Sequence, residues 1–141
     1  MPYPAFVIYA GESEYQNHFE QVYCRGPVVT FDGIPIRFQK RNFSHAFFES
    51  VKRKDDTFSR MRAERIDWIK AALQDPQSER YIGWDNKKKR HDGSRRVTVV
   101  MGNYVVVIGL NRQRNKGRFI AAYVADSGRT IKKIRNGPKW A

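Results

Sequence analysis

The sequence predicts an α+β fold in which helices pack on one face of an antiparallel β-sheet. Two observations support this prediction. The longest helical pattern, at residues 55–74, lies in the first half of the chain. Three strand-like segments follow at 97–101, 104–110 and 118–125, and a tight Gly102-Asn103 turn joins the first two. Helices that precede a run of consecutive strands are typical of the α+β class.

The other elements follow from turn and cap residues. Residues 14–23 are compatible with a helix, which Gly26-Pro27 would end. Residues 28–38 show a hairpin pattern around Asp32-Gly33, and Pro35 places the second strand at an edge of the sheet. The remaining expected elements are a short helix at 42–51, a strand at 80–84, a polar loop at 85–96, a basic loop at 111–117 and a short helix or tail at 127–134.

The length of 141 residues suits a single domain with its own core. We assign residues 27–141 to this domain and residues 1–26 to an N-terminal segment that is helical in part. The one cysteine, Cys24, excludes an intrachain disulfide and favours a reducing compartment. No apolar run approaches the ~20 residues of a membrane span, and the N-terminus lacks the basic residues of a signal peptide. We therefore expect a cytoplasmic protein without a membrane partner.

The charge balance is the strongest functional signal. Lys and Arg number 27 against 14 Asp and Glu, so the formal net charge is +13 and the isoelectric point is about 10.2. Such an excess destabilises a compact fold by self-repulsion, so it indicates an anionic partner, with nucleic acid first and an anionic membrane surface second. The residues that we expect to contact nucleic acid are Lys40, Arg41, Lys87, Lys88, Lys89, Arg90, Arg112, Arg114 and Lys116.

Two arginines interrupt the apolar face of the expected helix at 55–74, for which Thr57 or Ser59 is the candidate cap. Arg62 and Arg65 fall on the stripe that this helix would turn toward the core. A guanidinium that faces a core must reach an anion or extend to solvent. Both arginines could therefore point into a phosphate-binding cleft. The alternatives are a structural pair with a carboxylate such as Glu49, or a position at the exposed edge of the helix.

His45 and Tyr123 are the other candidate catalytic residues. His45 lies near the start of a short helix with Glu49 one turn later, and a carboxylate beside an imidazole orients it for acid–base catalysis. Tyr123 shares a strand face with Phe119 and Ala121, where it could donate to a phosphate or stack on a base. The alternatives are a histidine without a role and a tyrosine of the core or of an interface.

The sequence offers little for metal chemistry. Three scattered histidines and one cysteine show no zinc spacing, and no paired acidic motif indicates a two-metal nuclease. The chain also lacks a glycine-rich loop of the kind that cradles phosphates. We therefore expect neither a metal nor another cofactor.

Several stretches from the hairpin onward share order, spacing and element type with a known family. They are Phe43-Ser-His-Ala-Phe-Phe-Glu49, Phe58-Ser-Arg-Met-Arg-Ala-Glu-Arg-Ile-Asp-Trp-Ile69, Asp75-Pro76, the valine-rich pair around Gly102-Asn103-Tyr104, and Phe119-Ile-Ala-Ala-Tyr-Val-Ala-Asp126. Through this ensemble, over roughly residues 28–136, the chain resembles the phage-type members of the barnase–EndoU–colicin–RelE-like nuclease superfamily.

The resemblance implies two N-terminal helices on a four-stranded antiparallel sheet, and metal-independent endonucleolytic cleavage of RNA, often by a toxin or a phage-encoded effector. It matches His45 to the helix histidine that acts as acid or base. It matches Arg62 and Arg65 to basic positions of the second helix, and Tyr123 to the last-strand tyrosine. The chain departs from similar sequences before this tyrosine, where Ala121 and Ala122 stand in place of the usual Ser or Thr.

We therefore expect a metal-independent endoribonuclease, with RNA as its substrate and a protein inhibitor as a further partner. His45 would deprotonate the ribose 2′-hydroxyl, which attacks the adjacent phosphate to form a 2′,3′-cyclic phosphate. Arg62 and Arg65 would stabilise the developing charge, and Tyr123 would orient the phosphate or protonate the leaving oxygen. Two rival functions use the same fold: a non-catalytic nucleic-acid-binding module, and a phage structural or interaction protein whose basic face meets an acidic partner.

Overall fold

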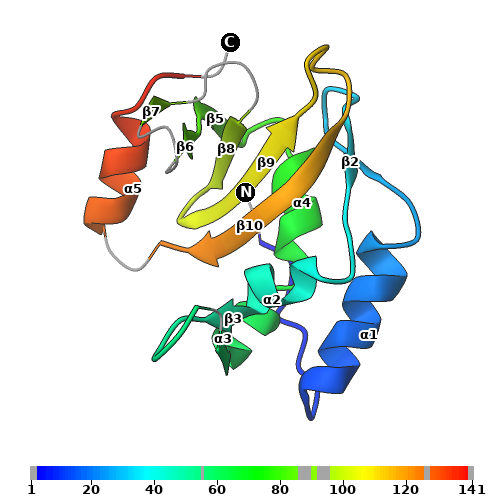
Figure 1. Cartoon of the computed structure of the whole chain (residues 1–141). Coiled ribbons are helices and arrows are strands. Elements are labelled where there is room, and N and C mark those ends of the chain that lie inside the picture. Colours follow the sequence, from blue (N-terminus) through cyan, green and yellow to red (C-terminus); the bar gives the residue numbers. More distant parts are fainter. Residues whose placement is uncertain (1–2, 55, 86–89, 92–95, 126–127, 140–141) are drawn as a thin grey trace.

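The computed structural model describes residues 3–54, 56–85, 90–91, 96–125 and 128–139 (Figure 1). The helices are α1 (Glu12–Tyr23), α2 (Asn42–Phe47), α3 (Arg60–Ala63), α4 (Trp68–Gln74) and α5 (Gly128–Arg135). The strands are β1 (Val28–Val29), β2 (Pro35–Arg37), β3 (Phe48–Glu49), β4 (Thr57–Phe58), β5 (Glu79–Ile82), β6 (Trp84–Asp85), β7 (Arg90–His91), β8 (Arg96–Met101), β9 (Tyr104–Leu110) and β10 (Gly117–Val124). The predicted α+β class is confirmed.

The main sheet, as far as the structure describes it, has six strands in the order β1-β2-β10-β9-β8-β5. All neighbours are antiparallel except β2 and β10, which are parallel. The predicted meander is present as β8, β9 and β10, and a left-handed glycine, Gly102 with φ 64°, forms the turn between β8 and β9. β3 pairs with β4, and β6 pairs with β7, in two small separate sheets.

The prediction of a four-stranded antiparallel sheet is wrong, because the 28–38 hairpin extends the sheet. β2 lies along the outer edge of β10, where Ile36 pairs with Gly117 and Arg37 with Arg118. Without this partner β10 would present a row of unpaired backbone groups. Gly117 allows the close approach, because a Cβ at this position would lie 2.7 Å from the Gly109 carbonyl oxygen and 3.1 Å from Ile36 Cδ1.

The hairpin itself is confirmed, but the edge position of its second strand is wrong. Val28 and Val29 pair with Ile36 and Pro35, and Gly33 takes a φ of 89° in the turn. The edge strand is β1, and β2 lies between β1 and β10. Pro35 is tolerated because the pairing with β10 begins one residue later, at Ile36, so the missing N–H interrupts no bond to β10.

The single helix predicted at 55–74 is also wrong, because this region forms β4, α3 and α4. Ser59, one of the predicted caps, begins α3 by accepting a hydrogen bond from the Arg62 amide at 3.3 Å. Two carbonyls that a continuous helix would use are then taken by distant partners. The Val7 amide donates to the Glu64 carbonyl at 2.8 Å. The Tyr23 hydroxyl donates to the Ile66 carbonyl at 2.6 Å and accepts from the Lys70 amide at 3.0 Å.

The core lies on both faces of the sheet. Alternate residues of β9, from Tyr104 to Leu110, join the larger cluster with α1, α2 and α4. Val105 and Val107 face the other way and pack in a smaller cluster with Ile131 of α5. Figure 1 shows α4 crossing behind β9 and β10, with α5 at the far side of the sheet.

Candidate nucleic-acid interface

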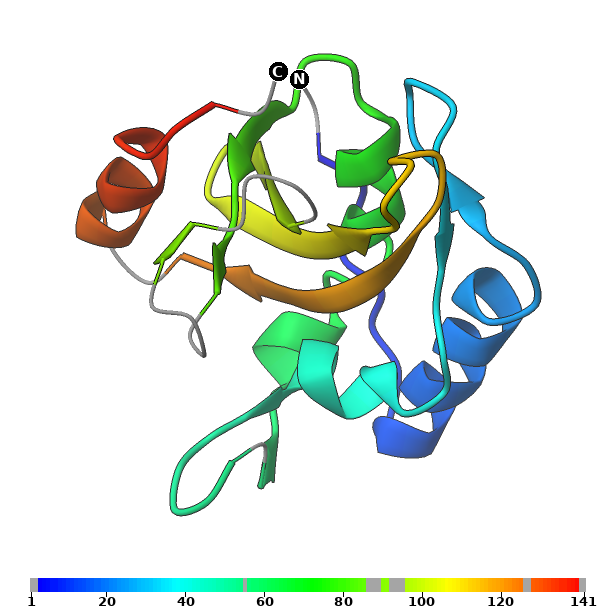
Figure 2. The same cartoon turned by 45° about the horizontal axis from the view of Figure 1, so that its top comes forward.

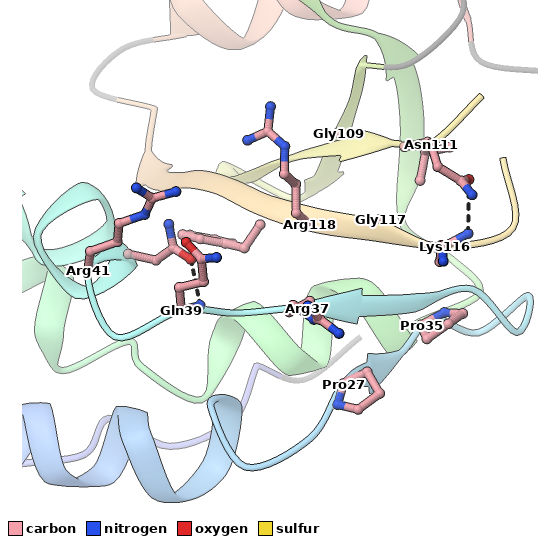
Figure 3. A pocket seen from close by; sticks show the side chains of 13 residues that line it. Pro27, Pro35, Arg37, Gln39, Arg41, Gly109, Asn111, Lys116, Gly117 and Arg118 are labelled. Carbon is pink, nitrogen blue, oxygen red and sulfur yellow. Dashed lines mark hydrogen bonds between the residues drawn. The ribbon is translucent and has the colours of Figure 1, made fainter. Parts of the chain in front are cut away.

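A cavity of about 640 Å³ lies where β2 and β10 diverge (Figure 3). β2 pairs with β10 through two residues only, and the chain then turns into α2, which packs against β10 further along. The Asn42 side chain forms this turn by accepting a hydrogen bond from the Gln39 amide at 2.8 Å. The cavity is lined by Pro27, Pro35, Arg37, Gln39, Arg41, Asn42, Gly109, Leu110, Asn111, Lys116, Gly117, Arg118 and Phe119.

Strand alternation places the first of these side chains in the cavity. Ile36 and Phe38 are buried in the larger cluster, so Pro35, Arg37 and Gln39 point to the opposite side. The apolar residues of this segment thus hold it to the core, while its polar residues are presented to the cavity.

Four of the lining residues are cations: Arg37, Arg41, Lys116 and Arg118. Among the residues that the structure describes, no acidic side chain lines the cavity. Within the described residues, none of the four cations forms a side-chain ion pair. In Figure 3 the side chains of Arg41 and Arg118 extend on the same side of β10. We call this site the cationic cavity; its positive field is uncompensated, so it favours an anionic ligand.

The loop between β9 and β10 is ordered by one side chain. Asn111 Oδ1 accepts from the amides of Asn115 at 3.0 Å and Lys116 at 3.2 Å, and the Asn111 amide donates to the Lys116 carbonyl at 2.9 Å. These bonds fix Lys116 at the entrance of β10, beside the cavity (Figure 3). Arg112 and Arg114 lie in the same loop and are exposed.

The predicted contact residues are placed as follows. Arg41 and Lys116 line the cationic cavity. Lys40 is largely exposed and pairs with Glu20 at 3.7 Å, which is a surface pair of little energetic weight. Lys87, Lys88 and Lys89 lie outside the described residues. The backbone of Arg90 lies in β7, but its side chain is also outside the described part.

His45 lies on α2 and is half-buried. It follows Arg41 by four residues and Asn42 by three, so the helix brings it toward the side of α2 that carries these two cavity residues. His45 does not itself line the cavity.

Arg62 and Arg65 both have partners inside the molecule. The Arg62 guanidinium donates to the Phe48 carbonyl at 2.7 Å. The Arg65 guanidinium lies 4.6 Å from the centre of the Phe6 ring and 5.2 Å from that of Trp68, and it pairs with Glu64 at 3.3 Å. Arg65 therefore holds the N-terminal segment against α4.

Tyr123 packs with the α5 cluster. Tyr104 is paired with the next residue, Val124, and belongs to the larger cluster on the other face. Burial raises the pKa of both tyrosines, and the charges of Arg65 and Arg62 oppose the rise at Tyr104. The two arginines thus act on the face opposite to Tyr123. The structure does not assemble His45, Arg62, Arg65 and Tyr123 around the cationic cavity.

Two of the four cavity cations, Arg37 and Arg118, are absent from the predicted contacts. The signal for Arg37 was present as the alternation of Ile36 and Phe38 with polar neighbours. Arg118 follows the basic loop directly, on a strand whose buried residue Phe119 sets its direction. Only the pairing of β2 with β10 brings the two arginines opposite each other.

No group of three metal-binding side chains is found among the described residues. None of the described helices is long and apolar enough to cross a membrane. Comparisons with protein-family models, curated proteins and solved structures find no match for this chain. The fold and the site therefore define its class: a basic α+β protein with a cationic cavity between β2, β10 and the start of α2.

Proposed function

We propose that this chain binds nucleic acid, with RNA as the preferred partner, in the cationic cavity. The observation that carries the proposal is the lining, whose described residues include four cations and no acidic residue. Arginine forks match the oxygen pairs of phosphate groups. The net charge of +13 would steer a polyanion to the site. The preference for RNA rests on the resemblance of the sequence to the ribonuclease superfamily.

The apolar part of the lining supports a nucleotide rather than a free inorganic anion. Leu110 and Phe119 are buried residues of the core that border the cavity, and Pro27 and Pro35 border it as well. A base or a sugar can contact such a surface while the arginines hold the phosphate. Small-molecule and nucleotide sites commonly combine an apolar lining with a few placed polar groups.

The binding test uses a fluorescent single-stranded RNA and a series of salt concentrations. We expect Arg37→Gln and Arg118→Gln each to weaken binding about fivefold to tenfold and to lower the salt slope by about 0.7. The matched control is Arg53→Gln, which removes the same charge from the exposed loop between β3 and β4 that projects away from the sheet (Figure 2). If both cavity variants bind as the control does, the site is elsewhere.

A second candidate function is metal-independent RNA cleavage, because His45 lies one helical turn from the cavity residues Arg41 and Asn42. In this reaction His45 takes the proton of the ribose 2′-hydroxyl. The 2′-oxygen then bonds to phosphorus, and the 5′-oxygen leaves and takes up a proton, which produces a 2′,3′-cyclic phosphate. Arg41 would stabilise the charge on the phosphate, since Arg62 and Arg65 have partners elsewhere.

The cleavage test incubates labelled RNA with the protein in the presence of a chelator. We expect wild type to produce cyclic phosphate ends and His45→Ala to lose about a hundredfold or more in rate. DNA of the same sequence lacks the 2′-hydroxyl and should remain intact. If wild type leaves all RNAs intact under conditions in which it binds them, the chain is a binding module and the cleavage candidate is rejected.

A further inference from the structure

Gly109 is a glycine near the end of β9 whose backbone conformation does not require glycine. Its φ is not in the left-handed region, which among the glycines of the described residues is found at Gly33 and Gly102. A Cβ at Gly109 would lie 3.2 Å from Ile120 Cδ1, so the end of this flexible side chain would have to shift by a few tenths of an ångström. Glycine inside a strand is destabilising and often marks a position where a ligand approaches the backbone closely.

Gly117, unlike Gly109, is a glycine that the packing of the backbone requires. A Cβ there would lie 2.7 Å from a backbone oxygen, that of Gly109, so packing alone accounts for the glycine. At Gly109 the nearest atom is instead the far end of a side chain, that of Ile120, so no backbone contact requires a glycine there.

The neighbours of Gly109 on the adjacent strands are arginines. Arg118 of β10 pairs with Gly109 on one side, and Arg96 of β8 pairs with it on the other. Arg118 pairs in turn with Arg37 of β2. Residues that are directly opposite share a face of the sheet, so the three arginines form one row across four strands, interrupted only by the glycine. At about 4.8 Å between strands, the row is roughly 14 Å long.

The position above Gly109 is bordered by the side chains of Ile120 and Arg118. The Arg118 guanidinium lies beside it, with Nε and Cζ each 3.8 Å from where a Cβ would be. Arg96 instead leans over Gly83, where its Cγ lies only 2.3 Å from the position of a Cβ. Neither Arg118 nor Arg96 forms an ion pair within the described part of the chain.

We propose that a single nucleic-acid strand crosses the sheet along this arginine row, at right angles to the β-strands, with one phosphate over Gly109. The inference rests on the proposed function and adds a path from the cationic cavity to Arg96. The strand enters at Arg37, passes Arg118 and reaches Arg96. Gly109 is the position at which its backbone comes nearest to the sheet.

The neighbours of the row favour a single strand over a duplex. The next pair toward α5 on this face is Thr98 and Val107, of which Thr98 is buried and Val107 packs in the α5 cluster. The arginine row is thus a single line of residues that packed side chains border toward α5. The row itself contains no aromatic side chain, so it holds the phosphates without stacking the bases, and binding along it is tolerant of sequence.

The test measures binding of a labelled mixed-sequence single-stranded RNA to Gly109→Ala and Gly109→Val. We expect both variants to fold, because alanine and valine favour a strand more than glycine does and Ile120 needs only a small shift; thermal unfolding checks this. We expect affinity to fall about fivefold for alanine and more than about tenfold for valine, as the phosphate is displaced. The control is Gly128→Ala in α5, where nothing lies within 4 Å of a Cβ and which is outside the row.

Arg96→Gln separates this inference from the proposed function. If Arg37→Gln and Arg118→Gln weaken binding but Arg96→Gln and Gly109→Val do not, the cavity binds nucleic acid and the path along the row is wrong. If none of the four weakens binding, the proposed function fails as well. A duplex of the same sequence that binds as tightly as the single strand would overturn the strand assignment, whereas equal binding of single-stranded DNA would overturn only the preference for RNA.

Discussion

The hydroxyl of Tyr23 determines where the helical region between α3 and α4 is interrupted. Its side chain is fully buried, and the hydroxyl bridges the Ile66 carbonyl and the Lys70 amide. We expect Tyr23→Phe to lower the free energy of unfolding by about 2 kcal/mol, because two backbone groups lose their partner in a buried site. Urea unfolding would measure this change.

The control for Tyr23 is Tyr3→Phe. The Tyr3 hydroxyl makes one long bond of 3.4 Å to the Met101 carbonyl, and the residue is 40% exposed. Its loss should cost less than about 0.5 kcal/mol. Equal effects of the two substitutions would mean that a direct helical bond from Lys70 to Ile66 replaces the hydroxyl at no cost.

Individual site residues differ in how far the sequence could predict them. Arg41 and Lys116 were found because they stand in basic segments that adjoin regular elements. Arg65 was interpreted as facing a cleft, and its aromatic partner Phe6 could not be foreseen, since it lies 59 positions earlier in the chain. A charged side chain on the apolar face of a helix needs a partner, but the sequence of the helix does not say which segment of the chain supplies it.

At the scale of elements, the loop between β3 and β4 depends on one carboxylate. Asp56 accepts hydrogen bonds from the amides of Val51, Arg53 and Lys52, and with the Thr57 hydroxyl these bonds lower its pKa to about 2. A lowered pKa means that the loop favours the charged carboxylate. Its stabilising effect is therefore complete above about pH 4, the range of an unfolded aspartate, and is lost as the pH falls through about 2.

An NMR titration checks this pH dependence. The amide signals of Val51 and Lys52 should shift with an apparent pKa of about 2, and Asp56→Asn should abolish this transition. A transition near the ordinary pKa of an aspartate, about 4, would show that the loop does not hold the carboxylate in solution.

The attachment of α5 to the sheet should depend on burial more than on charge. Ile131 is 9% exposed and packs on the strands, whereas Arg135 and Glu79 form a pair at 3.1 Å in which each side chain is 42% exposed. We expect Ile131→Ala to destabilise the protein by about 2 kcal/mol and Arg135→Gln by at most about 1 kcal/mol. Thermal or urea unfolding of both variants tests this order. A larger loss of stability for Arg135→Gln would mean that the ion pair holds α5 more than the burial of Ile131 does.

Elements with strong local signals were predicted well, and those that need distant partners were not. Gly33 and Gly102 mark turns by their own conformational freedom, so both hairpin turns are present as expected. The helix at 55–74 failed because Tyr23 and Val7 take carbonyls that its sequence alone would leave to the helix. The parallel pairing of β2 with β10 joins segments about 80 residues apart, and nothing in either segment specifies the other.

For the molecule as a whole, a net charge of +13 makes salt act in two opposite directions. In the free protein, added salt screens the repulsion among the cations, so we expect the melting temperature to rise between about 0.01 M and 0.15 M ionic strength. With single-stranded RNA at about 100 times its dissociation constant, binding should add roughly 2.7 kcal/mol to stability at low salt. This increment should shrink as salt rises, because phosphate contacts weaken with counterion concentration.

Thermal unfolding at several salt concentrations, with and without the RNA, measures both effects in one series. The melting temperatures measured with and without RNA should converge as salt increases. The melting temperature of the free protein rises because salt screens the repulsion among its cations, whereas that of the complex loses the contribution of the bound RNA. Arg118→Gln should narrow the gap at low salt, whereas Arg53→Gln should leave it nearly as in wild type, because only Arg118 lines the cavity. A gap that stays constant with salt would mean that the RNA is held by contacts other than those to its phosphates, and the cationic cavity would then not be the reason for binding.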